Sequence, residues 1–99
     1  RGAVLSTNIS IGNHNLIHFN CSIGHDVSMG DYNCIYPLTS LSGYTSLGNE
    51  NMIGTGTSTL PSCKIENRVN VGAHSLLKGD YESDITVFGA PAERKKDEF

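Results

Sequence analysis

The sequence predicts an all-β fold, a triangular prism of about four stacked parallel coils with a short C-terminal tail. Three observations predict it. An aliphatic residue recurs at every sixth position, a small or medium-sized residue stands two positions before nearly every one, and Gly and Asn are abundant. The chain of 99 residues has 11 Gly and 9 Asn, which both tolerate positive φ and therefore suit a chain that bends often.

The six-residue repeat starts at Leu5 and holds for thirteen steps, of which only Thr59 is not aliphatic. Six is an even number, so the column stays on one face of a pleated strand, whereas a 3.6-residue helix would rotate it away. Each repeat predicts a short strand and a bend, and three repeats make one triangular coil. An antiparallel sandwich is the alternative, but its strands lack a fixed period. The column consists of Leu5, Ile11, Ile17, Ile23, Met29, Ile35, Leu41, Leu47, Ile53, Thr59, Ile65, Val71 and Leu77.

Glycine directly follows the column residue in six of the thirteen repeats, as in Gly24 and Gly54. Asparagine is also frequent near the ends of the expected strands. We therefore expect Gly or Asn to supply the bends between strands.

Composition excludes several classes of protein. The formal net charge of −3 is too small for a disordered chain and has the wrong sign for a general nucleic-acid binder. No apolar run approaches the roughly 18 residues of a membrane span. Cys21, Cys34 and Cys63 are odd in number and lack CxxC spacing. They are expected to be reduced interior residues of a cytoplasmic protein, not disulfides or zinc ligands.

Two segments carry a family resemblance. Residues 23–31 read IGHDVSMGD and residues 87–92 read VFGAPA. With the aliphatic-Gly repeat, they resemble the hexapeptide-repeat acyltransferases, and in particular the subgroup that acetylates sialic acid and nucleotide-linked amino sugars. The resemblance covers nearly all of the chain. It implies a left-handed parallel β-helix, an exception to the usual right-handed crossover.

The resemblance implies acetyl transfer from acetyl-CoA to an amine or a hydroxyl, with His25 as general base. Histidine suits that task near neutral pH, and the Asp26 carboxylate could orient the ring. Because consecutive strand residues point to opposite faces, Asp26 either reaches His25 through the bend or serves another chain. An 18-residue coil places Gly43 in the same column as His25, where a missing side chain leaves room for the thioester.

The resemblance also implies a donor site in the groove between two subunits of a homotrimer. Residues 53–56 and 71–75 are similar to coils that line acetyl-CoA. Thr55 and Ala73 within them are small and lie in one column with Pro37, so the pantetheine arm could run close to the backbone. Small residues in such a column are also what a tight coil needs. Pro91 in the exit segment is a further expected donor-binding residue, and no metal is expected.

The expected organisation is a β-helix over residues 1–86 and an exit segment with a basic tail over residues 87–99. Full-length members of the subgroup begin with a nucleotide-sugar-binding α/β domain, which is expected to be absent from this chain. The sequence opens at Arg1 without an initiator Met or a signal-peptide pattern, so the chain is expected to be a fragment. Three alternatives therefore remain for the acceptor: a nucleotide-linked amino sugar, a sialic acid hydroxyl and an unrelated small amine. His18, Tyr36 and Glu66 also depart from the residues usual in the subgroup.

Two alternative functions arise for this fold. A γ-type carbonic anhydrase has the same helix, but its zinc ligands include two histidines five positions apart, and the four histidines here contain no such pair. A non-catalytic trimeric module for binding or assembly stays open. His14 and His74 are expected at the surface, and the role of His18 is open.

Basic residues concentrate in the second half of the chain, where all but Arg1 follow residue 63. The C-terminal end of the prism is therefore expected to be basic locally. That charge would suit the phosphates of coenzyme A, or it would belong to a solvated tail.

Overall fold

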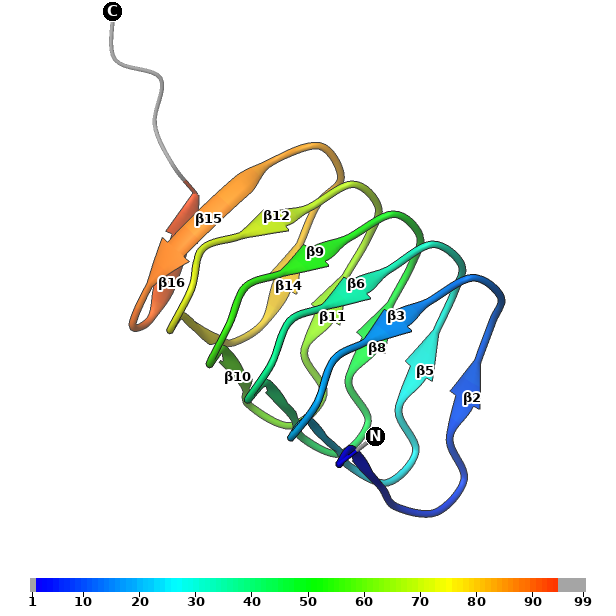
Figure 1. Ribbon diagram of the computed structural model, residues 1–99. Helices are drawn as coiled ribbons and strands as arrows, with labels where there is room; N and C mark the ends of the chain where they lie inside the picture. The colour runs from blue at the N-terminus through cyan, green and yellow to red at the C-terminus, as the bar shows by residue number, and fades with distance from the viewer. Residues whose placement is uncertain (1, 95–99) are drawn as a thin grey trace, which may run out of the picture.

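The computed structural model describes residues 2–94, which form an all-β prism without a helix (Figure 1). Short strands of successive coils stack as three parallel sheets, one on each side of the triangle. The first sheet holds β1 (Val4–Leu5), β4 (Ser22–Ile23), β7 (Ser40–Leu41), β10 (Ser58–Thr59) and β13 (Leu76–Leu77). The second holds β2 (Ser10–Ile11), β5 (Ser28–Met29), β8 (Ser46–Leu47), β11 (Lys64–Ile65) and β14 (Asp80–Tyr81).

The third sheet holds β3 (Leu16–Ile17), β6 (Cys34–Ile35), β9 (Met52–Ile53), β12 (Asn70–Val71), β15 (Thr86–Gly89) and β16 (Ala92–Arg94). Only β16 runs antiparallel, as a return strand against β15. The expected boundary at residue 86 falls inside β15, so the last coil and the exit segment share this strand. The described residues include no apolar helix of the length that a membrane crossing needs.

Strand pairing confirms the 18-residue coil. Ile23 pairs with Leu41, and Met29 pairs with Leu47. Each sheet contains one strand from each of five coils, so the expectation of about four coils is one coil short.

The additional coil arises where the six-residue register breaks. β13 ends at Leu77 and β14 starts at Asp80, which pairs with Lys64, whereas an unbroken register would pair Lys64 with Glu82. Gly79 forms this shortened corner at φ +84°, in the left-handed region that glycine adopts without strain. Tyr81 takes the interior position, where its hydroxyl accepts a hydrogen bond from the Lys78 amide (3.0 Å) and donates one to the Ala92 carbonyl (3.2 Å).

From Ile23 to Leu77 the aliphatic column forms the interior of the prism, whereas Leu5 in the first coil is exposed. Ile35, Ile53 and Leu77 are fully buried. Thr59, the single polar member, is also buried, and its hydroxyl accepts a hydrogen bond from the Ser42 amide (2.9 Å) and pairs with the Thr45 hydroxyl (2.9 Å). The threonine is tolerated in the core because its polar atom is satisfied there.

The bends differ from the expectation. Except at the shortened corner with Gly79, the left-handed residue of each corner is the third after the interior residue, and it is Asn in only some corners. Asp26 (φ 58°), Leu38 (φ 64°) and Tyr44 (φ 62°) adopt this conformation as well. Gly24, by contrast, is not in the left-handed region: a Cβ there would lie 2.8 Å from the Leu41 carbonyl oxygen. The prediction that Gly supplies the bends is therefore wrong for the position directly after the column residue. Glycine is needed there because the backbone of the next coil lies too close to leave room for a side chain.

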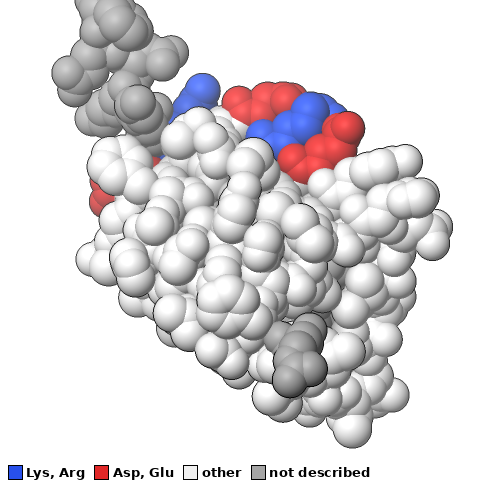
Figure 2. Space-filling model, viewed as in Figure 1, with Lys and Arg blue, Asp and Glu red and all other residues white. Residues whose placement is uncertain are grey.

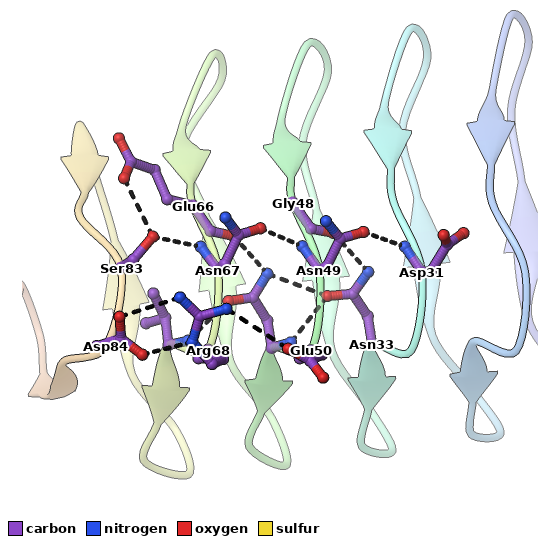
Figure 3. A network of polar contacts seen from close by, with 12 residues as sticks. Asp31, Asn33, Gly48, Asn49, Glu50, Glu66, Asn67, Arg68, Ser83 and Asp84 are labelled. Carbon is purple, nitrogen blue, oxygen red and sulfur yellow. Dashed lines mark hydrogen bonds and ion pairs between the residues drawn. The ribbon is translucent and has the colours of Figure 1, made fainter.

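Asparagine side chains form ladders between coils at the corner that joins the second and third sheets (Figure 3). In the inner ladder, the Asn51 amide group donates to the Asn33 side-chain oxygen (3.0 Å) and to the Glu66 carbonyl (2.8 Å), and its oxygen accepts from the Val69 amide (2.8 Å). In the outer ladder, the Asn49 side chain accepts one bond, from the Asp31 amide (2.7 Å). Asparagine is thus abundant because it links coils as well as forming bends.

The inner ladder should contribute more to stability than the outer one. Replacing Asn51 by Ala leaves buried backbone groups without partners, and we expect the free energy of unfolding to fall by about 3 kcal/mol. Asn49→Ala removes one exposed bond and should cost about 1 kcal/mol or less. Urea unfolding of both variants measures the difference, and equal losses would contradict the ladder's role.

A second prediction concerns Cys63, whose thiol is fully buried. Burial, and to a lesser extent the Asp80 carboxylate, raises the pKa of Cys63 to about 11. The unfolded chain releases this proton at lower pH. The contribution of Cys63 to stability is therefore complete below about pH 8.5 and is lost as the pH rises towards 11. Unfolding experiments from pH 8 to 11 should show a smaller decline for Cys63→Ala than for the wild type or for Cys34→Ala.

Candidate active site

His25 and Asp26 lie at the corner between the first and second sheets, directly after β4. The left-handed conformation of Asp26 turns its carboxylate back, so that its Oδ2 is 3.1 Å from His25 Nδ1. The structure thus brings together two consecutive residues that a straight strand would separate. Both side chains are accessible: the His25 side chain is 55% exposed and that of Asp26 32% exposed.

Gly43 occupies the same corner on the next coil, directly against the imidazole. A Cβ at Gly43 would lie 2.6 Å from His25 Nε2, so the ring fills space that any other residue would occupy. The Gly43 amide donates no hydrogen bond within residues 2–94. In the tautomer whose Nδ1 proton bonds to Asp26, the lone pair lies on Nε2, at the Gly43 side of the ring.

Tyr44 contacts the same imidazole from the side. Its ring centroid is 5.3 Å from that of His25, and the two ring planes are perpendicular. Sequence reasoning missed Tyr44, because the 18-residue columns place Tyr44 against Asp26 and not against His25.

Thr55 and Ala73 lie at another corner, the one between the third and first sheets. The amide that follows Ala73, that of His74, donates to the Thr55 carbonyl (2.7 Å), and the Gly56 amide donates to the Pro37 carbonyl (2.9 Å), as the column predicts. Within one chain the structure therefore groups His25, Asp26 and Gly43, and it groups Thr55 with Ala73, but it does not bring the two groups together. Pro91 lies in the exposed turn between β15 and β16.

The other three histidines lie at different places on the prism. His14 stacks on Tyr32, and His18 stacks on Tyr36, with ring centroids 5.0 and 5.1 Å apart. His74 is exposed and its ring lies over Gly56, where a Cβ would overlap Nδ1. In residues 2–94 no three His, Cys, Asp or Glu side chains come close enough together to hold a metal ion.

Charged side chains gather towards the C-terminal coils, with both signs mixed (Figure 2). Arg68 binds the Asp84 carboxylate through Nε (2.6 Å) and approaches Glu50 (3.5 Å), and Arg94 pairs with Glu82 (3.3 Å). The Arg68 guanidinium lowers the pKa of Asp84. In its described part this end is therefore not locally basic, contrary to the expectation; Lys95 and Lys96 of the expected basic tail lie outside the described residues.

Comparison with known proteins gives matches in structure alone. No protein-family model and no curated protein matches the sequence. A perosamine N-acetyltransferase from Caulobacter crescentus, solved with CoA and GDP-perosamine, superposes with a TM-score of 0.81 at 22% identity, over 97% of this chain and 54% of that one. The acetyltransferase domain of PglB from Neisseria gonorrhoeae gives 0.77 at 20% identity, over 94% of this chain and 57% of that one.

Soybean serine acetyltransferase gives a TM-score of 0.83 at 25% identity, over 88% of this chain and 40% of that one. The chain spans about half the length of these structures. The left-handed winding that the resemblance implies is consistent with the superpositions. The resemblance to the hexapeptide-repeat acyltransferases is thus confirmed at the level of the fold, which this chain shares with acetyltransferases of three different kinds.

Proposed function

We propose that the chain transfers an acetyl group from acetyl-CoA to an amine or hydroxyl of a small molecule, with His25 as general base. The observation that carries this proposal is the imidazole held between the Asp26 carboxylate and the side-chain-free Gly43. The fold shared with three acetyltransferases supports it, as does the CoA bound to the perosamine enzyme.

The chemistry needs one proton acceptor at the site. As the acceptor's nitrogen or oxygen attacks the thioester carbon, His25 Nε2 takes its proton and the Asp26 carboxylate stabilises the imidazolium. The C–S bond then breaks, and the imidazolium returns the proton to the sulfur of coenzyme A. The Gly43 amide, which has no partner in the described residues, is suited to stabilise the oxyanion formed in between.

The donor site requires a second copy of the chain, since Thr55 and Ala73 lie at a different corner from His25. We infer a homotrimer with parallel axes, in which His25 of one subunit faces the Thr55–Ala73 column of its neighbour. Pro91 would line the donor near the exit segment. A sugar or sugar nucleotide is the acceptor class that the GDP-perosamine complex suggests.

Removing the base should abolish most of the activity. We expect His25→Asn to lower the rate of acetyl transfer by about 10²–10⁴-fold, and Asp26→Asn to lower it less, because the base itself remains. Thiol release from acetyl-CoA with a panel of amino sugars and sialic acids measures both effects. Wild-type turnover in His25→Asn would refute the catalytic assignment, and CoA binding without transfer to any acceptor would favour a binding module.

A bulky residue in the donor column should block coenzyme A without disturbing assembly. Ala73 is exposed at its corner, so we expect Ala73→Trp to fold and to keep a trimeric mass in sedimentation, while calorimetry detects no CoA binding. Glu66→Trp, at the exposed corner between the second and third sheets and away from both halves of the proposed site, offers a comparison for the effect of a surface tryptophan. Unchanged CoA affinity in Ala73→Trp would place the donor elsewhere, and a monomeric wild type would refute the shared site.

A further inference from the structure

Three of the four histidines contact a tyrosine of the next coil, and one of these contacts differs from the others. Tyr32 and Tyr36 stand one full coil after His14 and His18, and each pair stacks with nearly parallel rings, at interplanar angles of 13° and 14°. Tyr44 stands one position beyond a full coil from His25, and the rings of this pair meet at 90°.

The difference follows from the residue that stands in the column of His25. That residue is Gly43, so no side chain stacks on the imidazole in the way that Tyr32 and Tyr36 stack on theirs. Tyr44 instead reaches the ring from the adjacent column, and Nε2 lies directly against the side-chain-free Gly43. A perpendicular aromatic contact is a favourable geometry, so the ring is held without being covered.

We propose that Tyr44 is a positioning residue, which holds the His25 imidazole with Nε2 against Gly43; this inference rests on the proposed function. The Asp26 hydrogen bond fixes the Nδ1 end of the ring but leaves its plane free to turn. The Tyr44 ring restrains that plane from the side, and the Gly43 backbone lies against Nε2, so three contacts together define the direction of the Nε2 lone pair. The ring of Tyr44 performs this role, and its hydroxyl is not required.

Neither burial nor backbone conformation accounts for tyrosine at this position. Tyr44 is 60% exposed and adopts the left-handed conformation, which a bulky side chain disfavours. Tyr32 offers a matched control, because it has the same exposure, nearly the same φ (60°) and a histidine contact of its own, but it lies at a different corner.

The experiment compares Tyr44→Ala, Tyr44→Phe and Tyr32→Ala in the full chain. NOE signals from the His25 ring protons to the Gly43 backbone report the orientation of the His25 ring without any substrate and do not depend on the ring current of Tyr44. We expect Tyr44→Ala to change the His25 ring signals and to lower kcat about tenfold with little change in the KM for acetyl-CoA, the effect of one aromatic contact. Tyr44→Phe should keep both the signals and kcat within about twofold, and Tyr32→Ala should change the signals of His14 and not those of His25.

Two results would overturn the proposal. One is a set of unchanged His25 signals in Tyr44→Ala, which would mean that the ring is held by other contacts. The other is an equal loss of kcat in Tyr44→Phe and Tyr44→Ala, which would assign the effect to the hydroxyl. A wild type without acetyl transfer would refute the proposed function instead, and the NMR comparison would still decide whether Tyr44 restrains the ring.

Discussion

The backbone hydrogen bond between neighbouring coils is the interaction on which the rest of the structure depends. The Val4 amide donates to the Cys21 carbonyl and the Ser22 amide to the Thr39 carbonyl, and the same step along the chain recurs through the coils of full length. Strands as short as these are not stable as isolated pairs, so they persist because each is one step of a continuous ladder. This ladder fixes which side chains share a column. It thereby determines the glycines at close approaches, the asparagine ladders and the space beside His25.

The period of six was sufficient to predict the coil, its three sides and its interior, because an even repeat and a pleated backbone allow few other arrangements. It did not predict the fifth coil, where a shortened corner carries Tyr81 in place of an aliphatic residue. Nor did it predict the bends. Glycine recurs in the sequence because the backbones of neighbouring coils approach closely, as at Gly24. The left-handed conformation of the bends is adopted by residues as unlike as Leu38 and Asp26. Composition does not distinguish a close approach between coils from a left-handed bend, since both favour glycine.

For the candidate site, the column of 18 predicted that Gly43 lies against His25, and the bend allows Asp26 to reach the same ring. Tyr44 could not be predicted, because its contact crosses from one column to the next and depends on a side-chain direction that the period does not define. The sequence also led to a wrong prediction for the charge of the C-terminal end. Counting basic residues ignores that Arg68 and Arg94 each face a carboxylate on a neighbouring turn of the chain.

The return strand β16 has a consequence for solubility. A stack of coils ends in open strand edges, onto which the first coil of another molecule could add, and repetition of that event would build a fibre. β16 occupies the last edge of the third sheet in antiparallel orientation, with Glu93 and Arg94 exposed. An incoming coil needs all three sheet edges in parallel register, and one of them is taken. The short strand at the end of the exit segment therefore protects the chain against head-to-tail polymerisation.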